Sequence, residues 1–325
     1  MSSPFPPPAI AALLLLSAAA CAPPPGEPSG DPTPDEEPGV PLRFQSIDSG
    51  DHAVCGILED GTGRCWGGWQ PSPDADPAPI EGYPVAPAGD DLREIAVGRW
   101  DVCALRGDGT LACEGIGDWL HPPPEGEFVA LDVHGQTACA VGVDGGLRCW
   151  GEWVGEAFRP PKGHHWARVA VGGQARWDEP TGCAMDRSGG LHGWGREVGY
   201  QLDVPPSGAF IDYDLDWSHG CALRGDGEIT CWGSDEFEQL DAPAGPWIQA
   251  EAGGTVSCGL RPDGRIECWG AGGWEPLCEE ALDVPDGVFR SISAGSCFGC
   301  GVALDGEVRC WGRADRGELT PPTED

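Results

Sequence analysis

The stretch that decides the fold is Cys221-Ala222-Leu223-Arg224-Gly225-Asp226-Gly227-Glu228-Ile229-Thr230-Cys231. Its centre predicts a hairpin with a three-residue loop, a type I turn followed by one left-handed residue. Gly227 suits the left-handed position because it has no Cβ atom. Counting outward from this loop places Cys221 directly opposite Cys231, whereas a two-residue loop would miss the pairing by one position.

The same spacing of ten positions recurs along the 325-residue chain. Directly opposed residues of a hairpin lie about 4.5 Å apart, which is close enough for a disulfide. The spacing therefore predicts six bridges within hairpins: Cys55/Cys65, Cys103/Cys113, Cys139/Cys149, Cys221/Cys231, Cys258/Cys268 and Cys300/Cys310. Zinc ligands and buried thiols are the alternatives, although zinc sites favour two to four intervening residues.

Three further cysteines lie outside this scheme. Cys183 stands opposite Gly193 in the fourth repeat and is expected to be a buried free thiol. Cys278 and Cys297 flank the junction of the sixth and seventh repeats and are candidates for a seventh bridge.

The repeat has a period near 40 residues. First strands are expected to begin 36 to 48 residues apart, near Phe44, Leu92, Phe128, Trp166, Phe210, Trp247 and Phe289. Closing strands are expected at residues 201–205, 239–243 and 281–285, each ending in Pro. Short strands at this period are typical of propeller blades. We predict an all-β fold, a seven-bladed β-propeller of four-stranded antiparallel blades over residues 42–325.

The repeat also resembles a known family. Its best copy joins His219-Gly220-Cys221-Ala222-Leu223 to Asp226-Gly227 and Cys231-Trp232-Gly233. This pattern resembles the repeats of the regulator of chromosome condensation family, and the propeller-type β-lactamase inhibitory proteins, in a version that looks like exported bacterial lipoproteins. The resemblance implies a seven-bladed propeller. It leaves function open, because members include an exchange factor, ligase accessory domains and enzyme inhibitors.

The N-terminus is interpreted as a targeting segment. The apolar run from Ala9 to Ala20 is too short to span a bilayer. Ser17-Ala18-Ala19-Ala20-Cys21 resembles a lipobox, which implies a signal peptide over residues 1–20, lipidation at Cys21 and a place in the bacterial outer membrane or on the cell surface. An ordinary secretory signal cut near Ala20 is the alternative. Residues 21–41 are rich in Pro, Gly and acidic residues and are expected to form a tether.

The formal net charge of −34 disfavours nucleic acid as a partner and disfavours binding to anionic membrane surfaces. The N-terminal lipid is therefore the one membrane contact that we expect. The sequence contains no recognisable catalytic motif, and we expect neither a cofactor nor a metal site. An enzyme is therefore not predicted, and a monomer is expected.

Non-periodic tryptophans suggest a binding face. Loops after the first and third strands of antiparallel blades fall on one face, and aromatic and acidic residues gather in these loops. The predicted ligand-binding residues are Trp69, Trp100, Trp119, Trp153, Trp177, Trp217, Trp274, Asp101, Asp178 and Asp216. Aromatic side chains with polar neighbours are typical of interfaces and of sugar sites.

The predicted ligand is a protein partner on the cell surface or envelope, with a glycan as the alternative. Two other functions stay open: a carbohydrate-cleaving protein and a purely structural envelope component. The tryptophans could also merely cover the ends of their own blades.

Overall fold

The computed structural model describes residues 40–68, 84–115, 120–152, 154, 158–174, 179–195, 204–205, 208–271, 278–313 and 317–324. The chain divides after Pro38, and the unit that begins at Gly39 is the one described below. The expected signal peptide, the lipidation site Cys21 and nearly all of the tether lie outside the described residues. In the described part, no helix is long and apolar enough to cross a membrane.

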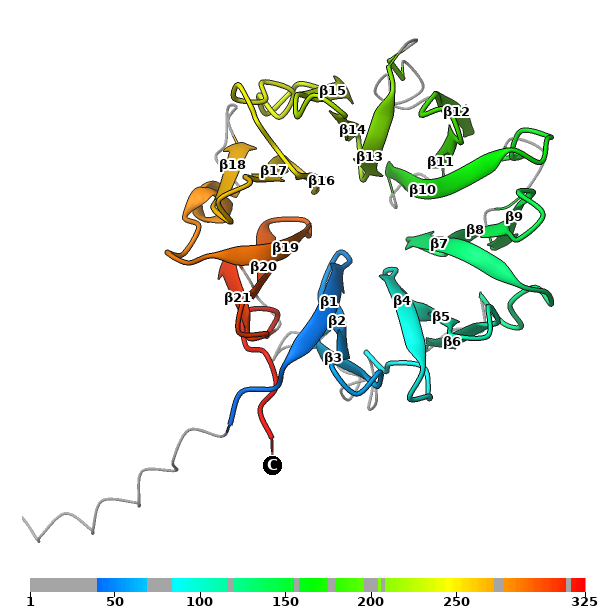
Figure 1. Cartoon of the computed structure of the whole chain (residues 1–325), viewed down its shortest axis with the longest axis horizontal. Helices are drawn as coiled ribbons and strands as arrows, with labels where there is room; N and C mark the ends of the chain where they lie inside the picture. Colours follow the sequence, from blue (N-terminus) through cyan, green and yellow to red (C-terminus); the bar gives the residue numbers. More distant parts are fainter. Residues whose placement is uncertain are drawn as a thin grey trace, which may run out of the picture. The chain divides into compact units, whose positions relative to one another are not determined.

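Seven antiparallel sheets of three strands each are arranged around a central axis (Figure 1). The inner strands, nearest the axis, are β1 (Phe44–Ser49), β4 (Leu92–Val97), β7 (Phe128–His134), β10 (Trp166–Gln174), β13 (Phe210–Leu215), β16 (Gln249–Ala252) and β19 (Phe289–Ala294). The middle strands are β2 (Ala53–Leu58), β5 (Asp101–Arg106), β8 (Thr137–Gly142), β11 (Glu179–Asp186), β14 (His219–Arg224), β17 (Val256–Leu260) and β20 (Phe298–Ala303). The outer strands are β3 (Gly63–Gly67), β6 (Leu111–Gly115), β9 (Leu147–Gly151), β12 (Leu191–Gly195), β15 (Ile229–Gly233), β18 (Ile266–Gly270) and β21 (Val308–Gly312).

The hairpin geometry agrees with the prediction from the cysteine spacing. Cys221 pairs with Cys231 in register, and the third residue of each of the seven turns is a Gly with φ between 76° and 88°. All six predicted hairpin pairs are disulfides, with Cα–Cα distances of 4.0 to 4.1 Å: Cys55–Cys65, Cys103–Cys113, Cys139–Cys149, Cys221–Cys231, Cys258–Cys268 and Cys300–Cys310. Their sulfurs are bonded to each other, so the alternatives of zinc ligands and free thiols do not apply to these twelve cysteines.

The two cysteines of each bridge differ in exposure. The first cysteine lies in the middle strand of its blade and is buried in all six pairs. The second lies in the outer strand, and five of the six are only half-buried: Cys65, Cys149, Cys231, Cys268 and Cys310. Cys113 is the exception and is buried at 4% exposure. The bridges therefore fasten the outer strand to the core in six of the seven blades.

The three cysteines outside the hairpin scheme also follow the prediction. Cys278 and Cys297 form a seventh bridge, between the segment before η1 (Glu279–Leu282) and the start of β20. Cys183 is a buried free thiol that pairs in register with Gly193.

Each turn glycine also joins its blade to the next one. Its carbonyl accepts the N–H of the first aromatic or aliphatic residue of the following blade, at 2.8 to 3.2 Å in all seven junctions. The last of these bonds, from Phe44 N to Gly306 O at 2.8 Å, closes the ring. Trp66 lies beside Phe44 with ring centroids 5.5 Å apart, and both pack with Phe298 and Val302 from the seventh blade. The apolar core therefore lies between neighbouring blades.

The prediction of a fourth strand is wrong for the two closing segments that the structure fully describes. Residues 239–243 form no strand, and residues 281–285 begin in the 3₁₀ helix η1. The third closing segment, residues 201–205, lies largely outside the described residues. Each of the two described segments ends in a Pro, which has no N–H for a strand ladder.

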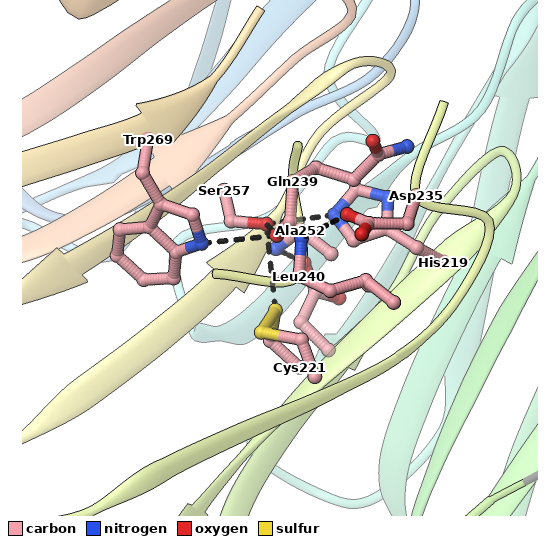
Figure 2. The surroundings of a disulfide bond; sticks show 10 residues. His219, Cys221, Asp235, Gln239, Leu240, Ala252, Ser257 and Trp269 are labelled. Atoms are coloured by element: carbon pink, nitrogen blue, oxygen red, sulfur yellow. Dashed lines mark hydrogen bonds between the residues drawn. A yellow bond between two sulfur atoms is a disulfide. The ribbon is translucent and has the colours of Figure 1, made fainter. Parts of the chain in front are cut away.

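A single backbone carbonyl replaces the missing strand ladder. Figure 2 shows Gln239, after the fifth blade, whose carbonyl oxygen accepts hydrogen bonds from Trp269 Nε1 and Ser257 Oγ of the sixth blade, both at 2.9 Å. Because Ser257 donates its proton to Gln239, the contact of 2.8 Å between His219 Nε2 and Ser257 Oγ requires the ring N–H to donate. The repeat tryptophan thus fastens the segment that precedes its own blade.

The same contact recurs around the ring. Trp150 Nε1 donates to Leu120 O at 3.1 Å, and Trp311 Nε1 donates to Ala281 O at 3.0 Å. At the closure, Trp66 Nε1 donates to Glu318 O at 2.8 Å.

Candidate functional site

The two ends of the ring differ in the segments that they carry. We call the end with the loops that follow the inner and outer strands the loop face. We call the opposite end the hairpin end, where the Gly-containing turns and the starts of the inner strands lie. The structure describes four of the ten predicted binding residues: Trp100, Asp101, Asp216 and Trp217. The other six, Trp69, Trp119, Trp153, Trp177, Trp274 and Asp178, lie outside the described residues.

Trp100 and Trp217 are both half-buried in loops that follow inner strands, in the second and fifth blades. The guanidinium carbon of Arg99 lies 5.4 Å from the centre of the Trp100 ring, within the range of a cation–π contact. Each of these indoles therefore leaves part of its surface exposed.

Asp101 is placed differently from the expectation. It is the first residue of β5, and its side chain is fully buried. A Cβ on Gly115 would lie 2.2 Å from Asp101 Oδ1, so the carboxylate packs against the backbone of the neighbouring strand. Asp101 therefore supports the loop that carries Trp100, and does not itself face a ligand.

Asp216 forms an ion pair across the mouth of the central channel. Asp216 Oδ1 of the fifth blade lies 3.1 Å from His134 Nδ1 of the third blade. His134 Nε2 lies 2.8 Å from Gly173 O of the fourth blade, so both ring nitrogens are donors and the imidazole is charged. Burial by itself would lower the pKa of His134, but the hydrogen bond and the charge of Asp216 raise it to about 9.

The central channel was not among the features predicted from the sequence. Four carboxylates occupy the inner-strand position that faces the first cysteine of each hairpin: Asp48, Asp132, Asp214 and Glu251. Ala96, Ala170 and Ser293 hold this position in the other three blades. The repetition of an acidic residue at one place in the repeat is the signal that could have revealed this ring.

The aspartates of the ring connect neighbouring inner strands. Asp48 Oδ2 accepts the N–H of Val97 at 2.7 Å, and Asp132 Oδ2 accepts that of Val171 at 2.5 Å. Asp214 Oδ2 in turn accepts the N–H of Ala252 at 2.9 Å. The cavity that these residues line measures about 40 Å³, which is room for a few water molecules.

Burial, and then the charges of neighbouring carboxylates, raise the pKa values of the carboxyl groups in this channel. Burial raises the pKa of Asp132 to about 7, although the N–H of Val171 opposes the shift. Burial and then the charge of Asp132 raise the pKa of Asp48, and burial and then the charge of Asp214 raise that of Glu251. Among the described residues, no group of three or more His, Cys, Asp or Glu side chains is arranged to hold a metal ion.

A family model described as the regulator of chromosome condensation (RCC1) repeat matches residues 217–239 and 289–318, in the fifth and seventh blades. Solved structures with the same architecture include the CRINKLY WD40 ectodomain of the Arabidopsis thaliana receptor kinase ACR4. That match has 21% identity and a TM-score of 0.62, and covers 83% of this chain and 98% of that one.

Two other solved structures extend the comparison. The ectodomain of the Physcomitrella patens receptor kinase CR4 is 22% identical, with a TM-score of 0.63, over 84% of this chain and 74% of that one. Prp20p of Saccharomyces cerevisiae is 16% identical, with a TM-score of 0.55, over 72% and 77% of the two chains. Similarity at these identities shows the fold alone. The matched repeats and the shared architecture together support an RCC1-like β-propeller.

Proposed function

We propose that this protein is a surface-anchored, non-catalytic binding module whose loop face holds a protein partner. The observation that carries the proposal is the pair of half-buried indoles, Trp100 and Trp217, beside the ion pair of His134 and Asp216. Indoles supply large contact area at low entropic cost, and neighbouring charges supply orientation. A rigid ring of bridged hairpins keeps such loops in place before the partner arrives.

Structural neighbours give independent support for a protein partner. One solved structure is that of Kap60 bound to yeast RCC1, and Prp20p is described with its binding properties to Gsp1p and histones. RCC1-like propellers are commonly interaction modules. The excess of acidic residues, with a net charge of −34, favours a partner that presents Lys and Arg to this face.

The same proposal includes export and anchoring. Seven disulfides are consistent with an extracellular protein, since such bridges persist in oxidising compartments. We assign residues 1–20 to a lipoprotein signal, residues 21–41 to a tether and residues 42–325 to the propeller, with lipid on Cys21. The propeller is expected to act as a monomer, in the outer membrane or on the cell surface.

The test is capture of an envelope protein by the full chain. Photo-crosslinking of the wild-type protein, in detergent, to a bacterial envelope extract should yield one dominant crosslinked partner, identified by mass spectrometry. Trp100→Ala with Trp217→Ala should reduce the yield at least tenfold. Val129→Ala, at an exposed position of the hairpin end, is the matched control and should leave the yield unchanged.

Other outcomes assign the protein to another class. A crosslink that survives the double tryptophan change contradicts the loop face as the binding surface. Retention or turnover of an envelope polysaccharide, in place of a protein, supports the carbohydrate alternative. The absence of any captured partner or glycan leaves a structural role in the envelope.

A further inference from the structure

Exposed apolar side chains gather at the hairpin end of the ring. Nine large apolar residues in the described part of the chain are more than a third exposed, and seven of them lie at this end. The seven are Val40, Val129, Val143, Ile211, Ile248, Val288 and Leu304. The other two, Val85 and Leu282, lie in the segments that connect outer strands to the following blades. Exposed apolar side chains on one face are candidates for an interaction surface.

A β-bulge explains why Val129 and Ile211 point outward. Phe128 pairs with Gly142 and Ala130 pairs with Val141, so Val129 is the extra residue of the bulge and is 53% exposed. Ile211 holds the same place in the fifth blade and is 57% exposed. Polar residues hold this place in three other blades: Gln45, Arg93 and Arg290. The bulge therefore accepts polar residues, and nothing in its geometry requires Val or Ile.

The exposed residues are clustered within blades. In the third blade, the N–H of Val143 donates to Glu127 O at 3.0 Å, which brings the turn beside the start of β7 and Val129. In the seventh blade, the N–H of Leu304 donates to Val288 O at 3.2 Å, so these two aliphatic residues are neighbours. Leu304 is 66% exposed, the most of any large apolar residue in the described part.

Two ion pairs lie at the hairpin end. Arg265 Nη2 lies 2.8 Å from Asp263 Oδ2, and Arg261 Nη2 lies 2.6 Å from Glu267 Oε2, both beside the sixth turn. Exposed pairs contribute little stability, but they reduce the net charge that a neighbouring surface meets.

The chain enters and leaves the propeller at the same end. Pro41 forms a bridge with Thr323, and Glu324 N donates to Val40 O at 2.8 Å. Residues 1–39 therefore continue from this end of the ring, and they contain the apolar run that leads to Cys21. Eighteen residues, 22–39, separate Cys21 from Val40. Fully extended they would reach about 60 Å, and shorter conformations bring the ring to the bilayer.

From the position of the termini and the exposed aliphatic side chains, we infer that the hairpin end rests on a lipid bilayer. The loop face then points away from the membrane, towards its partner. The inference rests on the lipid anchor of the proposed function and adds an orientation and a second contact surface. Val129, Ile211, Ile248 and Leu304 contact the headgroup region, where partly buried aliphatic side chains strengthen a single lipid anchor.

Hydrogen exchange of the full chain tests this orientation. The protein is compared in vesicles of phosphatidylethanolamine and phosphatidylglycerol and in detergent micelles. Amides of the hairpin end, in residues 141–146, 224–228 and 302–307, should exchange at least fivefold more slowly in vesicles than in micelles. Amides of residues 98–101, 134–137 and 215–218, on the loop face, should exchange at the same rate in both.

Substitutions separate a specific contact from simple proximity. Ile211→Asn with Ile248→Asn and Leu304→Asn should abolish the slowing while the protein stays in the vesicle fraction. Leu282→Asn, which also removes an exposed aliphatic side chain, is the control and should keep the slowing. If the triple variant is unstable, Leu304→Asn alone should reduce it.

Three results would overturn the inference, and they point to different causes. If the amides of the hairpin end exchange at the same rate in vesicle-bound protein as in micelles, the orientation is refuted and the anchor stays intact. Protection of the hairpin end that grows with protein concentration in the absence of vesicles shows that a second copy covers it. A full chain that does not float with vesicles refutes the anchor of the proposed function, and the inference with it.

Discussion

At the scale of single residues, His134 connects three blades. It lies in the third blade, contacts a carbonyl of the fourth at 2.8 Å and pairs with Asp216 of the fifth at 3.1 Å. Two donated hydrogen bonds require the charged imidazole, which agrees with a pKa raised to about 9. The stability of the ring should therefore depend on the charge of this one side chain.

Replacing the residue tests this dependence. The pKa of His134 is about 9 in the folded protein, against about 6.5 unfolded, so its stabilisation is present below pH 6.5 and lost as pH rises through 9. We expect His134→Gln to lower the free energy of unfolding at pH 6 by up to about 3 kcal/mol. The difference should become small at pH 10. Urea unfolding at both pH values measures it.

An exposed histidine supplies the control. His164→Gln, at a side chain that is 72% exposed, should leave the unfolding curves unchanged. If wild type exceeds His134→Gln in free energy of unfolding by the same amount at pH 6 and at pH 10, the imidazole stabilises the ring without its charge.

The residue-level predictions from sequence succeeded where a local rule decides the outcome. The turn fixes Gly227 in the left-handed region, at φ 88°, and places Cys221 opposite Cys231. The same rule, applied to five other turns, correctly pairs the outer-strand cysteines Cys65, Cys113, Cys149, Cys268 and Cys310. The role of Asp132 could not be found this way. A polar residue in a strand of alternating pattern ordinarily indicates a side chain that faces bulk solvent. Only the position of that strand as the innermost of its blade shows that the side chain faces the central channel.

At the scale of the inner strands, the acidic ring gives the fold its own pH dependence. Burial raises the pKa of Asp132 to about 7 in the folded protein, above its unfolded value near 4. Ionisation of this carboxyl therefore lowers the stability of the fold. The full stability is present below pH 4 and is lost as pH rises through 7. Asp132→Asn keeps an oxygen for the N–H of Val171 and removes the charge. The variant should be more stable than wild type at pH 8, by a few kcal/mol at most.

The comparison at pH 5 completes this test. At pH 5 the advantage of Asp132→Asn should shrink to less than half of its value at pH 8, because the folded-state carboxyl is then protonated and only its ionisation in the unfolded chain still favours unfolding. Asp226→Asn, at an exposed turn, is the control and should be neutral at both values. Thermal unfolding that gives Asp132→Asn the same advantage at pH 5 and pH 8 would contradict a buried carboxylate whose charge is costly.

The fourth blade lacks the bridge that the other six carry. Cys183 pairs in register with Gly193, and Gly193 is exposed and outside the left-handed region. Gly193→Cys should therefore form a disulfide and stabilise the protein by about 2–3 kcal/mol. Mass spectrometry detects the loss of two hydrogens, and thermal unfolding with and without reductant measures the gain. Gly193→Ser controls for the substitution, and free thiols in the oxidised variant would contradict the shared geometry.

The number of strands per blade illustrates what the sequence could not settle. The repeat predicts where a fourth segment lies, and Gln239 and Ala281 do contact the next blade there. Each contact uses one carbonyl and one indole, however, and no ladder forms. A short segment before Pro has the same composition whether it pairs along its length or at one atom, so the pattern could not distinguish the two.

At the scale of the whole molecule, the ring has one joint without a covalent connection. The seventh and first blades meet through Phe44 N and Gly306 O at 2.8 Å, and through Trp66 Nε1 and Glu318 O at 2.8 Å. No strand is shared across this joint, because β1–β3 and β19–β21 each come from one stretch of chain. The contacts that recur at other junctions, together with the bridge between Pro41 and Thr323, therefore hold the ring closed.

Two equivalent tryptophans allow this joint to be compared with a continuous one. Trp66→Phe and Trp311→Phe each remove one Nε1–H donor to a backbone carbonyl, at 2.8 and 3.0 Å in the native protein. Each should cost about 1–3 kcal/mol, because a buried carbonyl loses its partner. Only Trp66→Phe should also open the ring locally, since the sixth and seventh blades stay joined by the chain.

Native-state hydrogen exchange distinguishes the two effects. In Trp66→Phe, amides of β1 and β19 should exchange at least fivefold faster than in wild type, ahead of the other inner strands. In Trp311→Phe, the slowest amides of all seven blades should accelerate together, because only the global stability changes. Identical exchange patterns in the two variants would show that the closing joint is as firm as the continuous ones. The noncovalent contacts of this joint would then be sufficient to close a propeller of three-stranded blades.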